Sequence, residues 1–304
     1  MSAPRQTLSF LRRRLDEVGL RPRTRHGQNF LVDLNLLEVL VSAGELDRHD
    51  VVLEVGTGTG SLTARLAAAA GEVITVEVDD QLHQLASEEL ADASNVTMLQ
   101  CDALKNKNRL NPMVLEAIEQ RLAARPGARL KLAANLPYNI ATPLITNLLA
   151  LDRSPELMAV TIQKELADRL AARPSTKDYG ALSVWVQSQC EVELVREMPP
   201  TVFWPRPKVS SAIVQLRLVP ELRDRIAQQV GDRDYFHHFV RAMFFHRRKF
   251  LRAELLSFGA RQLDKPTVDG ILSELDLPPN TRAEQLDVAA MLRLCAAVRT
   301  RLGD

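Results

Sequence analysis

The sequence predicts an α/β protein, with a mostly parallel sheet between layers of helices and a small α-helical domain in the C-terminal part. Two observations lead to this prediction. Between residues 50 and 165, short β-rich runs alternate with segments of helical apolar spacing, whereas beyond residue 220 the pattern is helical throughout. Strict alternation of strand and helix is typical of right-handed βαβ crossovers, which build a parallel sheet covered on both faces. The 304 residues suffice for one large core and an appended domain.

Each element of the α/β part can be located. The expected parallel strands are VVLEV, EVITVEV, VTMLQCD, LKLAANL and LMAVTIQ, at residues 51–55, 72–78, 96–102, 130–136 and 157–163. Helical spacing falls between them, at residues 61–70, 81–91, 111–124 and 142–151. A helix at 180–189 follows, and strands at 191–198 and 210–219 would add an antiparallel pair to the sheet edge. The helical part breaks near Gly259 and at 277–281.

Charge is balanced overall but uneven along the chain. Lys and Arg number 39 against 38 Asp and Glu, so the net charge of +1 does not by itself indicate a nucleic-acid partner. Basic residues nevertheless gather in the arginine-rich segment 5–25 and in RAMFFHRRKFLR at 241–252. Two local basic patches are therefore available to an anionic partner.

The remaining composition excludes several classes of protein. The three cysteines form no CxxC pair and the six histidines have no metal-ligand spacing, so we expect neither disulfides nor a metal. No apolar run reaches the ~18 residues of a membrane span, and the N-terminus has no apolar signal core. An organellar transit segment is the alternative for the arginine-rich start, but Asp16 and Glu17 count against it. We therefore expect a cytoplasmic protein that does not enter a membrane.

A glycine-rich loop follows the first expected strand. In EVGTGTGSLT, Gly56, Gly58 and Gly60 stand between that strand and the next helix. Glycine tolerates positive φ and lets a ligand approach the backbone closely, beside the amides of a helix N-terminus. A dinucleotide site would need glycine in place of Ser61, so the loop better suits a nucleoside without a pyrophosphate. A tight turn without a ligand is the alternative.

Two acidic residues at strand ends indicate which nucleoside. Glu77 ends the second strand, where a carboxylate can accept hydrogen bonds from both hydroxyls of a ribose. Asp102 ends the third strand and could accept from the exocyclic amine of an adenine. Either acid alone could be a solvated strand-end residue, but together they favour a ribose and an adenine without a phosphate cradle. We therefore expect S-adenosyl-L-methionine as the cofactor.

The stretch NLPYNI at 135–140 ends the fourth strand and suits methyl transfer to an aromatic amine. The lone pair of an adenine N6 is delocalised into the ring, so acceptors must orient its N–H bonds and stabilise the charge that develops. The Asn135 side-chain oxygen and the Pro137 carbonyl could accept these bonds, while Tyr138 offers a flat face for an extruded base. The structural alternative is a strand that ends in an Asn-Pro turn.

Several motifs in one order resemble the small-subunit ribosomal RNA adenine N6,N6-dimethyltransferase family. The resemblance runs from about Arg25 to Leu218 and continues more weakly through the C-terminal helices. GQNFLVD at 27–33 resembles the family's entry motif, and EVGTGTGSLT, VEVD and QCDAL resemble its glycine loop and its ribose- and adenine-binding acids. NLPYNIATP resembles its catalytic loop, and QKELADRLAARPSTKDYGALSV and FWPRPKVSSAIVQL resemble two further family stretches.

The resemblance implies a Rossmann-like class I methyltransferase fold with a mostly parallel seven-stranded sheet. The implied activity is dimethylation of two adjacent adenosines in the 3′-terminal hairpin loop of small-subunit (16S) rRNA, with the immature 30S particle as partner during ribosome biogenesis. Residues 1–26 would be a basic helical extension, 27–219 the methyltransferase domain and 220–304 a helical RNA-binding domain. We expect a monomer.

The resemblance also assigns roles to residues that the spacing alone does not single out. Asn29, Leu31 and Asn135 would contact the cofactor, and Phe203 would stack opposite Tyr138, with ordinary packing beside Trp204 as the alternative. The residues expected to meet RNA phosphates are Arg206, Lys208, Arg247, Arg248 and Lys249. For the last three, a solvated helix face is the alternative. One departure from the family is the longer stretch between Asp102 and Asn135, where we expect a lengthened helix or a surface loop.

Three other functions remain as alternatives. One is the related methylase of large-subunit rRNA that confers macrolide resistance, although Leu136 and NIATP favour the small-subunit branch. Another is an assembly checkpoint that acts mainly by holding the immature subunit. The third is a dinucleotide oxidoreductase, which Ser61 disfavours.

Overall fold

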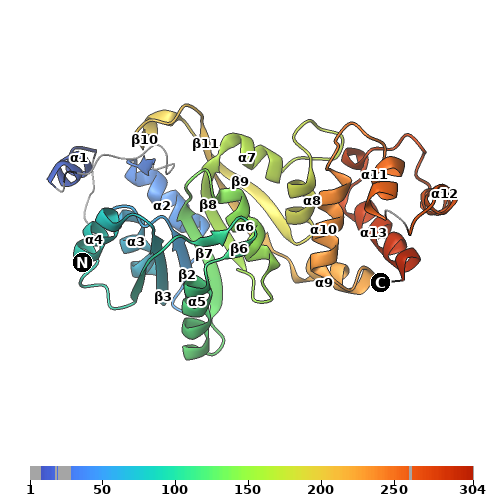
Figure 1. Ribbon diagram of the computed structural model, residues 1–304. Helices are drawn as coiled ribbons and strands as arrows, with labels where there is room; N and C mark the ends of the chain where they lie inside the picture. Colours follow the sequence, from blue (N-terminus) through green and yellow to red (C-terminus); the bar gives the residue numbers. More distant parts are fainter. Residues whose placement is uncertain (1–7, 18, 20–28, 260–261, 304) are drawn as a thin grey trace. The chain divides into compact units, whose positions relative to one another are not determined.

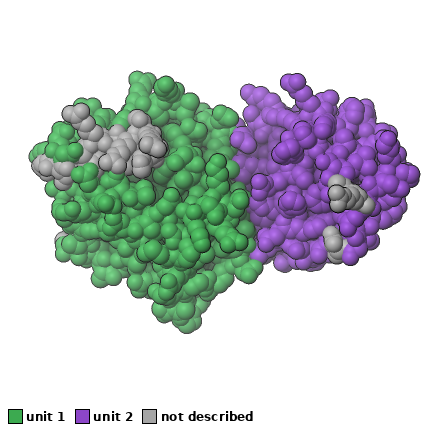
Figure 2. All heavy atoms as spheres, viewed as in Figure 1, with its two compact units in different colours: residues 1–167, 192–218 green, residues 168–191, 219–304 purple. Residues whose placement is uncertain are grey.

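The chain forms two compact units, residues 1–167 with 192–218 and residues 168–191 with 219–304 (Figure 2). The computed structural model describes residues 8–17, 19, 29–259 and 262–303. Four arginines of the basic N-terminal segment, Arg5, Arg21, Arg23 and Arg25, lie outside the described residues.

The first unit contains a seven-stranded sheet with the order β4-β3-β2-β7-β8-β11-β9. Its strands are β2 (Asp50–Val55), β3 (Glu72–Glu77), β4 (Val96–Gln100), β7 (Arg129–Asn135), β8 (Leu157–Gln163), β9 (Cys190–Met198) and β11 (Ser211–Leu218). The strands from β4 to β8 pair in parallel, and β11 runs antiparallel to β8. The predicted seven-stranded, mostly parallel sheet is therefore confirmed, with β9 at its edge.

Helices cover both faces of this sheet (Figure 1). They are α2 (Leu34–Ala43), α3 (Ser61–Ala69), α4 (Asp80–Glu89), α5 (Pro112–Ala124) and α6 (Ala141–Ala150). The next helix, α7 (Lys164–Leu170), follows β8, and its last three residues belong to the second unit. The side chains of Asp33, Asp79 and Asn111 accept backbone hydrogen bonds in the first turns of α2, α4 and α5, which fixes where these helices begin. Pro112 is the first residue of α5, a position at which a backbone N–H has no acceptor within the helix, so the N–H that proline lacks is not needed.

The sheet core shows why both faces need covering. Val51, Val52 and Leu53 are fully buried although successive residues of a strand point to opposite faces. Val52 packs in one apolar cluster with Leu40 of α2 and Leu66 of α3. Each such side chain stabilises the fold by about 1.5–3 kcal/mol relative to an exposed one. No helix among the described residues is long and apolar enough to cross a membrane.

Charged residues close the amino ends of the central strands. Asp50, at the start of β2, is completely buried and lies 2.8 Å from Arg129 Nε and 2.9 Å from Lys131 Nζ, both of β7. Arg48 donates from its guanidinium to the carbonyls of Ala68 and Ala70, at 2.7 and 2.9 Å. The cations Arg48, Arg129 and Lys131 at this end of the sheet are thus bound to groups of the protein itself.

Two small sheets are additions that the sequence pattern did not predict. β1 (Phe30–Leu31) pairs antiparallel with β10 (Phe203–Trp204), and β5 (Leu104–Asn106) pairs with β6 (Arg109–Leu110). The long stretch after Asp102 is therefore a β-hairpin followed by the thirteen-residue helix α5. Such strands of two or three residues are too short to produce a readable alternation.

An N-terminal helix, α1 (Leu8–Glu17), packs on the same unit. Its Leu11 and Leu15 are buried in a cluster with Leu82 and Leu85 of α4, as the helical apolar spacing predicts. Arg14 of α1 forms an ion pair with Glu88 at 3.2 Å. The helix is held by apolar contacts that an exposed ion pair supplements only slightly.

The second unit is helical. Its helices are α8 (Ala181–Gln187), α9 (Pro220–Gln229), α10 (Arg233–Met243), α11 (Leu251–Phe258), α12 (Lys265–Glu274) and α13 (Val288–Leu302), and short 3₁₀ turns lie at Pro200–Val202 in the first unit and Ala283–Gln285 in the second. The buried Trp185 of α8 stacks on His237 of α10 with ring centroids 4.3 Å apart, and burial lowers the pKa of His237 to about 4. Segment 168–191 belongs to this unit because its side chains pack with α10 and α13.

Candidate active site

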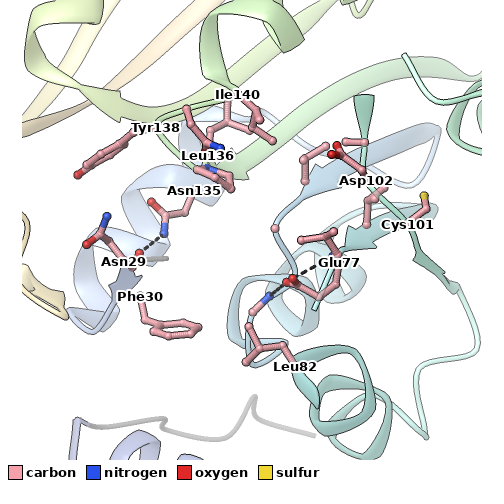
Figure 3. Close-up of a pocket in the computed structure, with 18 residues that line it drawn as sticks. Asn29, Phe30, Glu77, Leu82, Cys101, Asp102, Asn135, Leu136, Tyr138 and Ile140 are labelled. Carbon is pink, nitrogen blue, oxygen red and sulfur yellow. Dashed lines mark hydrogen bonds between the residues drawn. The ribbon is translucent and has the colours of Figure 1, made fainter. Parts of the chain in front are cut away.

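A cavity of about 420 Å³ opens at the carboxyl ends of the parallel strands. Ligands of such sheets bind at this edge, where the loops after the strands converge. Its walls come from the glycine loop after β2, the ends of β3 and β4, and the turn after β7, together with Asn29 and Phe30 (Figure 3). Residues that are distant in the sequence, among them Gly56, Glu77, Asp102 and Asn135, therefore share one pocket.

The glycine loop fits against two other walls of the pocket. Gly56, Gly58 and Gly60 have φ values of +90°, +57° and +79°. A Cβ on Gly56 would lie 3.3 Å from Pro137 Cδ, and one on Gly58 would lie 3.2 Å from the Phe30 ring. Only glycine supplies both the left-handed backbone and the close approach. Gly60 precedes α3 as its N-cap and is not among the residues that line the cavity.

Glu77 is a preorganised acceptor in the pocket wall. Its carboxylate accepts hydrogen bonds from the amides of Gly58 (2.9 Å), Val78 (3.0 Å) and Asp79 (3.0 Å). The side chain is only 5% exposed, and this burial raises the pKa of Glu77 above its ordinary value while the three amides oppose the shift. The bond to Gly58 ties the carboxylate directly to the glycine loop.

A buried network beneath this loop was missed by the sequence analysis. Glu54 Oε2 accepts hydrogen bonds from the hydroxyls of Thr63 and Thr75, each at 2.6 Å. The Thr57 hydroxyl lies 2.6 Å from that of Thr75, and because Thr75 donates to Glu54, Thr57 donates to Thr75. Burial raises the pKa of Glu54 to about 8. An acid inside the apolar run VVLEV was the available signal.

Asp102 lies at the rim of the cavity. It is exposed, and its Oδ1 accepts a hydrogen bond from the Leu104 amide at 2.9 Å. The neighbouring Cys101 also lines the cavity, and burial raises the pKa of its thiol, which keeps the thiol protonated at neutral pH. Figure 3 shows Asp102 and Glu77 on the side of the pocket opposite Tyr138.

Asn135 is held with its amide in one orientation. Its Nδ2 donates a hydrogen bond of 2.9 Å to the backbone carbonyl of Asn29 (Figure 3). The Oδ1 atom accepts no hydrogen bond from any described residue and is therefore available to a donor in the cavity. Because Asn29 belongs to the entry motif and Asn135 to the strand-end motif, one bond links the two motifs.

The two residues after Leu136 complete this wall. The Pro137 carbonyl accepts the Ile140 amide at 3.1 Å, which leaves one lone pair of that oxygen for a second donor. The Tyr138 hydroxyl lies 2.6 Å from Ser211 Oγ of β11, and burial raises the pKa of Tyr138. The ring lines the cavity and is fixed at its far end by this bond.

Leu31 and Phe203, both expected to serve the site, are buried in this structure. Leu31 and Phe203 face each other in the β1–β10 pair, are 8% and 3% exposed, and belong to the apolar cluster beneath the sheet. Neither lines the 420 Å³ cavity, although Leu31 lines a smaller adjoining hollow together with Gly56, Gly58 and Asn135. Since neighbouring strand residues point to opposite sides, the Phe30 ring faces the cavity while Leu31 packs in the core, and the Phe203 ring is packed in the same core cluster in this conformation.

The basic residues expected to bind RNA lie in both units. Arg206 and Lys208 of the first unit are exposed in the loop between β10 and β11. In the second unit, Arg247, Arg248 and Lys249 are exposed after α10, and Arg247 already pairs with Glu284 at 2.8 Å. Within the described part of the chain, no three His, Cys, Asp or Glu side chains gather as a metal site would require.

The sheet order, the glycine loop and the pocket define a Rossmann-like methyltransferase of class I. The same fold is found in the crystal structure of a dimethyladenosine transferase from Plasmodium falciparum, with a TM-score of 0.71 and 24% identity. The match covers 88% of this chain and 97% of that one.

The family follows from the sequence comparison. The model of the family described as ribosomal RNA adenine dimethylase matches residues 19–295, and the chain belongs to this family, as the motifs predicted. The chain is 42% identical to a ribosomal RNA small subunit methyltransferase A of Lactiplantibacillus plantarum, over 92% of this chain and 91% of the relative. It is 40% identical to the protein of the same name from Moorella thermoacetica, over 94% of each.

Proposed function

We propose that this protein uses S-adenosyl-L-methionine to dimethylate two adjacent adenosines in the 3′-terminal hairpin loop of small-subunit rRNA. The observation that carries the proposal is the free Oδ1 of Asn135, held by Asn29 in the same cavity as the glycine loop and Glu77. The curated relatives named above are small-subunit methyltransferases, which favours this substrate over large-subunit rRNA.

The cavity residues fit the nucleoside part of this cofactor. Glu77 is a fixed carboxylate acceptor for ribose hydroxyls, and Asp102 at the rim is an exposed acceptor for an adenine amine. A Cβ on Gly58 would lie 3.2 Å from the Phe30 ring, so the glycine lets this ring pack against the loop and form a flat apolar wall for the ligand. The cofactor supplies a methyl group on a sulfonium, which is already activated for displacement.

The chain's own residues then act on the target amine. Asn135 Oδ1 and the free lone pair of the Pro137 carbonyl accept its two N–H bonds, which turns the nitrogen lone pair toward the cavity and away from the adenine ring. The same acceptors stabilise the positive charge that develops on nitrogen. The bound cofactor would supply the methyl group, and the target nitrogen would afterwards release one proton to water. Tyr138 steadies the extruded base by stacking, worth about 1–3 kcal/mol.

Exposed cations would hold the RNA. Arg206, Lys208, Arg248 and Lys249 are exposed and suit phosphate contacts, whereas Arg247 would have to exchange Glu284 for a phosphate. Residues 220–304 would serve as an RNA-binding domain beside the methyltransferase domain 27–219, with 1–26 as a basic extension. Since one chain supplies every residue of the cavity, a monomer suffices. If the protein acts during ribosome assembly, it works in the cytoplasm.

The test is methylation of purified, undermodified small ribosomal subunits with labelled S-adenosyl-L-methionine, followed by mapping of the modified bases. We expect label on two adjacent adenosines near the 3′ end of the small-subunit rRNA. Label on large-subunit rRNA alone, or tight subunit binding without any transfer, would favour the resistance methylase or the assembly checkpoint. Calorimetric binding of NAD in preference to S-adenosyl-L-methionine would refute the cofactor assignment.

A further inference from the structure

The hairpin β5–β6 begins where the cavity wall ends. Asp102 and Ala103 line the cavity, and β5 starts at the next residue. From Lys105 to Arg109 every residue is exposed, while the flanking Leu104 and Leu110 are buried. Between residues 103 and 115 the chain has three cations, Lys105, Lys107 and Arg109, and no acidic residue.

These three cations have no partner among the described residues, in contrast to the cations at the other end of the sheet. The side-chain nitrogens of Lys105, Lys107 and Arg109 form no hydrogen bond or ion pair with a described residue, whereas those of Arg129 and Lys131 are paired with Asp50. Unpaired cations thus stand at the edge of the sheet that carries the cavity. Three positive charges on one short hairpin repel each other, and an anionic partner would reduce this repulsion.

The hairpin is held firmly in spite of its exposure. Asn111 Nδ2 donates to the Asp102 carbonyl at 2.8 Å, and the Asn111 amide donates to the Ala103 carbonyl at 2.9 Å. Asn147 of α6 donates to the Lys107 carbonyl at 3.2 Å. Because α6 begins directly after the 135–140 turn, the tip of the hairpin is tied to the helix that follows the proposed catalytic residues.

We infer that Lys105, Lys107 and Arg109 form a phosphate-binding rim that grips the RNA backbone next to the target adenosine. The inference rests on the proposed function and adds to it a binding surface on the segment between Asp102 and Asn135. We favour RNA over an acidic peptide because the hairpin adjoins, at Asp102 and Ala103, the cavity that contains the acceptors for the target amine. An RNA that places a base in this cavity has a phosphate on either side of that base and more along its backbone, which an acidic peptide lacks.

The test compares the wild-type protein with a Lys105→Ala/Lys107→Ala/Arg109→Ala variant on undermodified small subunits. We expect subunit affinity at about 0.15 M salt to fall tenfold or more, and the slope of log K against log salt to become shallower by about 2, since each lost phosphate contact removes roughly 0.7–0.9. The affinity for S-adenosyl-L-methionine, measured by calorimetry, stays within twofold.

A matched pair of single variants separates this surface from the general effect of charge. Arg109→Ala and Arg196→Ala each remove one exposed arginine of the first unit that has no described partner, and Arg196 lies on the edge strand β9. We expect Arg109→Ala to make the salt slope shallower and Arg196→Ala to leave it unchanged.

Each contrary outcome has its own meaning. If the wild-type protein methylates subunits and the triple variant keeps the wild-type affinity and salt slope, the rim is wrong while the proposed function stands. Equal effects of Arg109→Ala and Arg196→Ala would overturn it too, as would a parallel loss of cofactor affinity, because the hairpin would then act through Asp102. If the wild-type protein neither binds nor methylates subunits, the proposed function itself has failed.

Discussion

The amide nitrogen of Asn135 donates to the carbonyl oxygen of Asn29 at 2.9 Å, and this bond decides which end of the Asn135 side chain faces the cavity. An amide has one donor end and one acceptor end, so fixing the first commits the second. The acceptor oxygen is the end that an adenine amine requires. The proposed chemistry therefore depends on a contact between two motifs that lie 106 residues apart.

Asn135→Ala removes this oxygen and should abolish transfer with little effect on RNA binding. Loss of one acceptor for developing charge costs about 10²–10³ in rate. Single-turnover methylation of small subunits measures the rate, and filter binding measures the affinity. Asn135→Asp is the informative partner, because its carboxylate keeps an acceptor but cannot donate to Asn29. A variant Asn135→Ala that methylates at the wild-type rate would exclude the amide from catalysis.

Cofactor affinity should weaken as the pH falls, because a protonated Glu77 has lost an acceptor for the ribose hydroxyls. Burial raises the pKa of Glu77, so the loss begins above the pH at which an ordinary glutamate titrates. Calorimetric titration of S-adenosyl-L-methionine between pH 5 and 8 would detect the change. Glu77→Gln should bind S-adenosyl-L-methionine more weakly than wild type at neutral pH, approach the wild-type affinity as the pH falls, and so show a flatter profile. Identical pH profiles for the two proteins would remove Glu77 from ribose binding.

Glu54→Gln should stabilise the protein relative to wild type as the pH rises. The folded state keeps a proton on Glu54 up to about pH 8, whereas the unfolded chain releases it near pH 4.5. Between these values the unfolded state binds fewer protons, so the wild-type free energy of unfolding falls with pH by up to ~1.4 kcal/mol per unit from this site. Glutamine does not titrate, so the free energy of unfolding of Glu54→Gln lacks this decrease with pH.

Urea unfolding at a series of pH values measures this difference, with Glu193→Gln on the exposed face of β9 as the control. The gap between Glu54→Gln and wild type should widen from pH 5 to pH 8, while the control shows no such widening. A constant gap would mean that Glu54 is already ionised in the folded state.

Gly58→Ala should weaken cofactor binding in addition to the stability that it loses through backbone strain. Its φ is +57°, and the new Cβ would lie 3.2 Å from the Phe30 ring that lines the cavity. Gly127 is the matched control, since its φ is +82° and nothing lies within 4 Å of an added Cβ. Both variants should lose about 1–2 kcal/mol of stability, as left-handed alanine costs. Only Gly58→Ala should weaken S-adenosyl-L-methionine binding by tenfold or more in calorimetry, and equal binding by both variants would contradict this.

Local pattern was enough for the long elements and for the motifs at their ends. Strand β8 begins and ends at the residues expected, and the acids and glycines at the ends of β2, β3 and β4 are read from spacing because parallel strands must end at one edge. The direction of a side chain on a two-residue strand cannot be read in this way. The sequence therefore did not single out Phe30, which lines the cavity, and did not show that Leu31 and Phe203 are buried.

The succession of strands and helices along the chain, the glycine loop and the amide at the end of β7 were determined by the sequence alone, since alternation and strand-end residues are local features of the chain. Only the tertiary structure decided that Asn29 orients Asn135, that Glu54 supports the loop, and that three cations remain unpaired beside the cavity. These relationships join residues far apart in the chain, and they come from packing and from pairing of charges, neither of which spacing reveals.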